Sequence, residues 1–119
     1  MFASRLLLSA SLGIFMLPSL ARAADKPMSG KELASFLTSG DLQYTAGTSV
    51  RKLHYNTDGT VSQINADGVT MTGKWKGQGN QYCTMWPFRK NWKCFGIVTT
   101  ADGKFGDVED GKITGYFSR

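Results

Sequence analysis

The sequence predicts a mainly β fold: a small antiparallel meander or barrel of about seven strands, preceded by one short α-helix and carrying one hairpin disulfide. After Gly40, short segments of alternating apolar and polar residues follow one another along the chain. Asp-Gly pairs separate several of these segments, at residues 58–59, 67–68, 102–103 and 110–111. Because Asp-Gly tolerates the positive φ angles of tight turns, the pattern indicates consecutive hairpins.

The first 23 residues indicate a secretory signal peptide, so residues 24–119 are expected to form a single β-rich domain. Arg5 supplies a positive start, the run LLLSASLGIFML is apolar, and Ala21-Arg22-Ala23 matches a cleavage site. No second long apolar run follows, so we predict no transmembrane segment in the mature chain. We therefore expect the protein in the periplasm or secreted.

The net charge of the chain says little about which class of partner the protein binds. Lysine and arginine number 14 against 9 acids, and Arg5 and Arg22 belong to the predicted leader. So mild a basic balance does not point to nucleic acid. Cations outnumber acids between Arg51 and Lys93, which is compatible with a positive side or end of the domain, but a mixed solvated surface is the favoured interpretation.

The segment MSGKELASFLTSG predicts the helix, over about residues 29–38. Ser29 and Glu32 have the spacing of a capping box, and Gly40 is a plausible stop. The apolar residues expected to pack on the sheet share one helical face: Leu33, Phe36 and Leu37.

Seven segments are expected as strands, from about residue 48 to residue 118. Their sequences are SVRKLHY, TVSQI, VTMTGKWK, QYCTMW, WKCFGIVTT, KFGDV and KITGYFSR. Consecutive antiparallel pairing is the simplest order, and rolling the meander into a barrel would remove its exposed edges. Few large apolar residues follow one another within the predicted strands, so one face of each strand is expected to be exposed to solvent.

The stretch YCTMWPFRKNWKC, residues 82–94, holds both cysteines, and two cysteines in an exported chain of this size favour a disulfide. A hairpin that pairs Cys83 with Cys94 leaves Pro87–Lys90 as a four-residue loop. The same register pairs Thr84 with Lys93, Met85 with Trp92, and Trp86 with Asn91. One face then holds Cys83, Met85, Trp92 and Cys94. We expect this face to carry the disulfide and to belong to the core. The other face holds Thr84, Trp86, Asn91 and Lys93.

The tip of this hairpin combines aromatic and cationic side chains and is the candidate binding surface. The candidate residues are Trp75, Trp86, Phe88, Arg89 and Lys90. Such a tip suits an anionic glycan, a lipid headgroup or an acidic protein surface. The competing interpretation is that Trp86 and Phe88 cover the barrel mouth while Arg89 and Lys90 are solvated.

The sequence contains no recognised catalytic or metal-binding motif. It has no nucleophile elbow, zinc-protease, P-loop or dinucleotide motif. His54 is the only histidine, and with two distant cysteines it does not make a zinc set. We therefore predict no catalytic residue, no cofactor and no metal.

The motifs Gly73-Lys74-Trp75, Cys83 to Trp86, and Cys94-Phe95 follow one another in the second half of the chain. This pattern resembles small exported alphaproteobacterial proteins of mostly unassigned function, which implies a helix before a strand-rich domain. It is also distantly similar to the small periplasmic metalloprotease inhibitors of avidin-like fold. That second resemblance implies an inhibitory N-terminal segment, which would here be residues 24–28.

These observations predict an exported, non-catalytic binding module that contacts a protein, a glycan or an anionic surface through its aromatic–cationic hairpin loop. One alternative is an inhibitor of an extracellular protease or lysozyme. Another is an enzyme with an unrecognised site, which an open cavity gathering His54 with an acidic side chain would favour. A structural role in the envelope is a further alternative.

Overall fold

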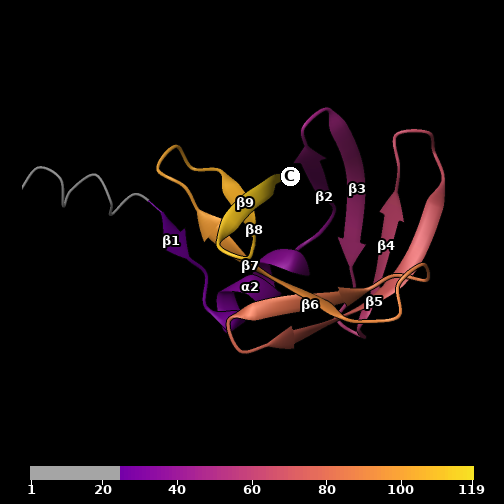
Figure 1. The fold of residues 1–119 in the computed structure, drawn as a ribbon, viewed down its shortest axis with the longest axis horizontal. Helices are drawn as coiled ribbons and strands as arrows, with labels where there is room; N and C mark the ends of the chain where they lie inside the picture. The colour runs from indigo at the N-terminus through magenta and orange to yellow at the C-terminus, as the bar shows by residue number, and fades with distance from the viewer. Residues whose placement is uncertain (1–24) are drawn as a thin grey trace, which may run out of the picture.

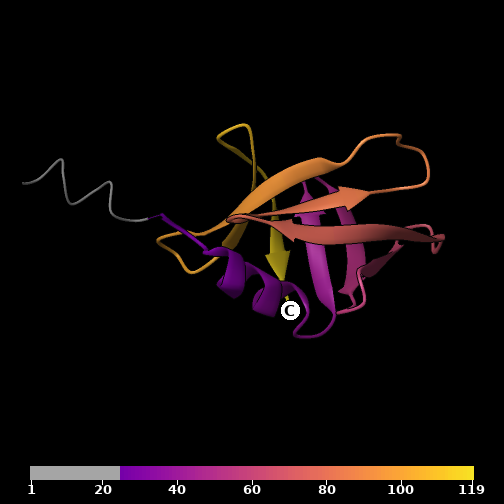
Figure 2. The ribbon, with the colours of Figure 1, turned by 90° about the horizontal axis from the view of Figure 1, so that it is seen from below.

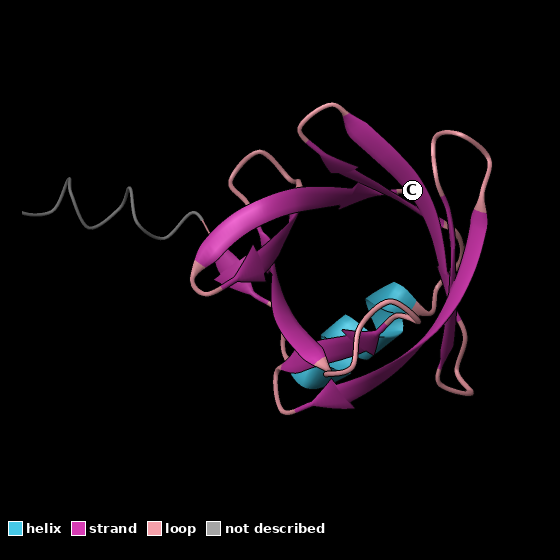
Figure 3. Cartoon of the chain, turned by 45° about the vertical axis from the view of Figure 1, so that its right-hand side comes forward, coloured by secondary structure: helices cyan, strands magenta, loops and turns pink. Residues whose placement is uncertain are grey.

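Eight antiparallel strands close into a barrel, with a helix at one end (Figures 1 and 3). The computed structural model describes residues 25–119, so the predicted signal peptide lies outside the described residues. The elements are β1 (Lys26–Pro27), α2 (Gly30–Leu37), β2 (Leu42–Ala46), β3 (Ser49–Tyr55), β4 (Thr60–Ile64), β5 (Thr70–Gln78), β6 (Gln81–Met85), β7 (Lys93–Thr99), β8 (Phe105–Glu109) and β9 (Lys112–Ser118).

The strands follow the predicted meander. Each strand from β2 to β8 pairs with the next one in sequence, and β9 returns to pair with β2, so the sheet has no free edge between its first and last strands. The seven predicted strands are β3 to β9. The structure adds β2 to the barrel, and the two-residue β1 pairs with the end of β7 through Lys26 and Pro27.

The predicted Asp-Gly turns are confirmed at all four positions. Gly59, Gly68, Gly103 and Gly111 have φ angles of 92°, 84°, 81° and 78°. An L side chain rarely adopts this backbone conformation, which glycine reaches without a steric cost. These turns join β3 to β4, β4 to β5, β7 to β8 and β8 to β9. The local turn chemistry therefore explains much of the meander.

Helix α2 covers one end of the barrel. Ser29 and Glu32 form the predicted capping box, with the Glu32 N–H donating to Ser29 Oγ at 3.2 Å and the Ser29 N–H donating to Glu32 Oε1 at 2.9 Å. The helix ends at Leu37 with Thr38 as its C-cap, in agreement with the expected range of about 29–38. Its predicted apolar face is buried, and the Phe36 ring lies 4.7 Å from that of Phe105. Figure 2 shows the β6–β7 loop at the other end of the barrel from α2.

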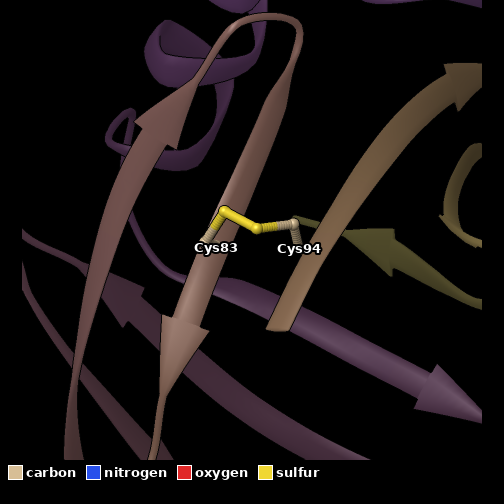
Figure 4. The surroundings of a disulfide bond; sticks show 2 residues. All are labelled: Cys83 and Cys94. Carbon is tan, nitrogen blue, oxygen red and sulfur yellow. A yellow bond between two sulfur atoms is a disulfide. The ribbon is translucent and has the colours of Figure 1, made fainter. Parts of the chain in front are cut away.

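The predicted disulfide joins Cys83 of β6 to Cys94 of β7 (Figure 4). The register around it is also confirmed at Thr84 and Lys93. The ladder ends there, so Met85–Trp92 and Trp86–Asn91 are not pairs of the sheet, and the loop between the strands is longer than Pro87–Lys90.

The predicted assignment of the two hairpin faces is only partly confirmed, because Cys83 is a buried core residue in the disulfide but the face turned to the barrel interior is the other one. Tyr82 and Thr84 line the interior of the barrel, so Cys83 between them points to the outer side. Cys83 is nonetheless 0% exposed. The face that carries Thr84, Trp86 and Lys93 is the inner one. The period of two defines two faces but does not say which of them meets the core.

The start of the described chain is held to the barrel. Lys26 and Pro27 pair with Thr99 and Val98, and the Met28 N–H donates to Ile97 O at 2.8 Å. Insertion of residues 24–28 into another protein would therefore require these contacts to open. In the described part of the chain, no helix has the length and apolarity needed to span a membrane.

Candidate functional site

A cavity of about 290 Å³ lies in the barrel, and its lining includes Ala46, Arg89 and Glu109 at or beside the turns opposite α2. We call this end of the barrel the mouth; the turns β2–β3, β4–β5, β6–β7 and β8–β9 lie there. Inward-facing side chains of the strands and the β6–β7 loop line the cavity: Tyr44, Ala46, Arg51, Leu53, Tyr55, Gln63, Tyr82, Thr84, Trp86, Arg89, Lys93, Phe95, Asp107, Glu109, Thr114 and Phe117. The lining therefore combines aromatic walls with charged groups, as in sites that orient a small ligand.

The floor of the cavity is built around Asp107. Along β8 the inward residues from the mouth are Glu109, Asp107 and Phe105, and Phe105 packs on the helix. Asp107 is only 4% exposed. Tyr82 donates to its Oδ1 at 2.6 Å, and Tyr44 donates to its Oδ2 at 3.2 Å. Both carboxylate oxygens are therefore held by hydroxyl groups from other strands.

Burial controls the protonation of this cluster. Desolvation raises the pKa of Asp107 to about 6, even though its two tyrosine hydrogen bonds oppose the change. Burial also raises the pKa values of Tyr82, Tyr55 and Tyr44, and the Asp107 charge adds to each of these increases. At neutral pH the floor thus contains one largely ionised carboxylate among three neutral phenols.

Two glycines make room for the walls of the cavity. A Cβ atom on Gly115 would lie 2.3 Å from the Tyr44 hydroxyl oxygen, so only glycine at this position lets Tyr44 reach Asp107. A Cβ atom on Gly73 would lie 2.7 Å from Trp86 Cε3. The glycine of the Gly-x-Trp strand therefore allows Trp86 to lie against β5 at the mouth.

The mouth of the cavity carries three cations. Lys93 Nζ lies 2.7 Å from Glu109 Oε2, so its charge is compensated. Arg51 donates to the neutral Gln63 at 3.3 Å, and its guanidinium lies 5.4 Å from the centre of the Tyr44 ring. The Arg89 guanidinium lies 5.7 Å from the Phe88 ring centre. Neither arginine forms an ion pair with any other residue in the range 25–119.

The structure separates the five predicted binding residues. Trp86 and Arg89 line the cavity, whereas Phe88 is 66% exposed and Lys90 is also exposed outside the cavity lining. Trp75 is a core residue whose Nε1–H donates to Asn56 O at 2.7 Å and whose ring packs edge-on against Tyr55. The hairpin tip therefore contributes to the mouth through two of its residues.

The histidine lies away from the cavity. His54 alternates with the inward-facing Leu53 and Tyr55, so it points out of the barrel, where its Nδ1 lies 2.7 Å from Asp41 Oδ1. The cavity thus does not bring His54 to an acidic side chain, which was the arrangement that would have favoured an enzyme. Among residues 25–119, no group of three or more histidine, cysteine, aspartate or glutamate side chains is placed to hold a metal ion.

Sequence reasoning missed most of the cavity lining. The missed polar and charged residues that carry the site are Tyr44, Arg51, Tyr82, Lys93, Asp107 and Glu109. One signal was present: in KFGDVE, two acids share the strand face of Phe105. A face that carries both a large aromatic residue and two carboxylates suits neither a dry core nor a simple solvated surface.

Comparison of the chain with protein-family models, with curated proteins and with solved structures finds no match.

Proposed function

We propose that this protein is an exported, non-catalytic binding module that takes a small organic anion into its barrel cavity. The observation that carries the proposal is a cavity of about 290 Å³ lined by two arginines without an ionic partner among the described residues. Export is supported by the predicted leader and by the Cys83–Cys94 disulfide, because such bonds persist in oxidising compartments.

The anionic character of the ligand follows from Arg51 and Arg89. A planar guanidinium presents parallel N–H donors that match a carboxylate or a phosphate group. Both side chains are partly buried at the mouth, where water screens a charge less than at an open surface. An anion that enters the mouth would give both arginines a partner.

The apolar part of the ligand is accommodated by the walls. Trp86, Phe95 and Phe117 line the same cavity and offer ring surfaces for stacking. The volume lies at the lower end of the range of ligand pockets, which favours a molecule smaller than a typical drug. A compact aromatic or aliphatic carboxylate fits both the size and the charge.

The proposal modifies the role of the hairpin loop. Trp86 and Arg89 would contact the ligand from the β6–β7 loop, whereas Phe88 and Lys90 would not. The disulfide-bonded hairpin would therefore form one wall of the mouth. In this arrangement the loop both binds the ligand and covers part of the barrel opening, so the two interpretations of the hairpin tip are compatible.

The test is isothermal titration of 3-phenylpropionate into the wild-type protein and into Arg51→Gln, Arg89→Gln and Lys90→Gln. Loss of a charged hydrogen bond corresponds to a roughly tenfold to hundredfold weaker affinity. We expect that loss in the two arginine variants. Lys90→Gln is the matched control because Lys90 neighbours Arg89 but does not line the cavity. Equal effects of all three substitutions, or no binding to the wild type, would contradict the proposal.

A further inference from the structure

Asp107 is a buried carboxylate without a cationic partner. The ion pairs among residues 25–119 are His54–Asp41, Lys93–Glu109 and Lys104–Asp102, and none includes Asp107. Buried charges in proteins are normally paired, because the loss of hydration is otherwise uncompensated. Two tyrosine hydroxyls satisfy part of its hydrogen-bonding capacity but bring no positive charge.

The position of Asp107 links it to the ligand cavity. Its side chain lines the same cavity as Arg51 and Arg89, yet it forms an ion pair with neither of them. Each of its oxygens accepts one hydroxyl hydrogen bond, and a carboxylate has about four acceptor sites in total. The floor therefore retains capacity to accept N–H donors from a molecule in the cavity.

The surroundings of Asp107 also suit a cation. The Tyr44 ring lies 5.1 Å from that of Phe117, and the Tyr82 ring lies 6.3 Å from it, so the two tyrosines that donate to Asp107 both lie near Phe117, which lines the same cavity. Aromatic faces attract organic ammonium groups, and the attraction grows when water is excluded. A carboxylate in a cavity that also has aromatic side chains in its lining is a combination suited to an amine.

We propose that Asp107 binds a protonated amine of the ligand, so that the ligand is an amino-acid-like zwitterion with its ammonium group on the floor and its anionic group at Arg51 and Arg89. This inference rests on the proposed function, since it assigns the second end of the same ligand. It explains why one cavity keeps an acid and two arginines apart: the ligand supplies the missing partner of each.

The test compares three probes that share one phenyl group and a short side chain: L-phenylalanine, 3-phenylpropionate and phenethylamine. Titration calorimetry at pH 7.5 should give an affinity for phenylalanine at least tenfold higher than for phenylpropionate, because only phenylalanine carries both an ammonium group and a carboxylate. Asp107→Asn should remove this advantage while phenylpropionate binds as tightly as before or more tightly. Phenethylamine should bind the wild-type protein through Asp107, and Asp107→Asn should lose this binding as well.

Asp110→Asn is the matched control. Asp110 lies in the exposed turn of the same β8–β9 hairpin, and asparagine tolerates its φ of 52°. This variant should keep all three affinities. Binding of phenylpropionate without any gain for phenylalanine, or unchanged phenylalanine binding by Asp107→Asn, would overturn the inference and leave the proposed function standing. Failure of 3-phenylpropionate to bind the wild-type protein would overturn the proposed function itself.

Discussion

Asp107 should make the stability of the protein depend on pH. Its pKa is about 6 in the folded state against an ordinary value of 3.8, so the folded protein binds this proton more tightly than the unfolded chain does. The corresponding stability is fully present below about pH 4 and is lost as the pH rises through about 6. A pKa difference of one unit between the folded and unfolded states is worth about 1.4 kcal/mol, so the loss amounts to about 3 kcal/mol.

Asp107→Asn should therefore raise the free energy of unfolding at pH 7 by up to about 3 kcal/mol, with little difference remaining at pH 4. Asparagine can accept from Tyr82 and donate to Tyr44, which keeps both contacts. The acidic and phenolic groups around the position, Glu109 and Tyr44, Tyr55 and Tyr82, are common to both proteins. Urea unfolding of both proteins from pH 4 to pH 7 measures the effect, and a difference that does not change with pH would refute it.

Individual residues show where sequence reasoning succeeds and where it fails. The partner of Cys83 was predictable because the hairpin register has few solutions that also bring two cysteines together. Its outward direction was not, because Met85 and Trp92 made the cysteine face look more apolar than the face of Thr84 and Lys93. Asp107 was missed because patterning rules assume an apolar interior, and the interior of this barrel is partly polar.

The disulfide contributes at the scale of the β6–β7 hairpin. It closes a short ring in the unfolded chain, with a sequence separation of 11 between the cysteines, and the chain-entropy model assigns about 3 kcal/mol to such a ring. The double variant Cys83→Ala/Cys94→Ala should lose about this much free energy of unfolding. Urea denaturation measures it, and the reduced wild-type protein provides the control. A loss well below 1 kcal/mol would mean that the β-ladder alone holds the hairpin.

The elements that were predicted are those with strong local chemistry. The capping box of Ser29 and Glu32 identifies the helix, and the Asp-Gly turns separate most of the strands β3 to β9. Strand β2 was missed because the turn after it uses Gly47 without a preceding aspartate. Strand β1 is two residues long, includes a proline and depends wholly on pairing with the distant β7.

At the scale of the whole molecule, closure of the barrel follows from β2. Without this strand, β3 and β9 would be the edges of an open seven-stranded sheet; with it, both edges are paired. Closure also creates the cavity, since it brings Tyr44 of β2 to Asp107 of β8. The mouth carries charges of both signs, because Glu109 and Asp107 share the cavity with Arg51, Arg89 and Lys93. Residues far apart in sequence thus meet in the site, which local patterns do not reveal.

We propose that the ligand enters the barrel instead of docking on the tip of the hairpin. A titration of the ¹⁵N-labelled protein with 3-phenylpropionate, followed by amide chemical shifts, tests it most directly. We expect saturable changes in the amide chemical shifts of residues in the cavity-lining strands, at Arg51, Thr84, Phe95 and Asp107. The changes at Phe88 and Lys90 should be smaller. Shifts confined to residues 87–90, or no shifts in the barrel at saturating probe, would contradict it.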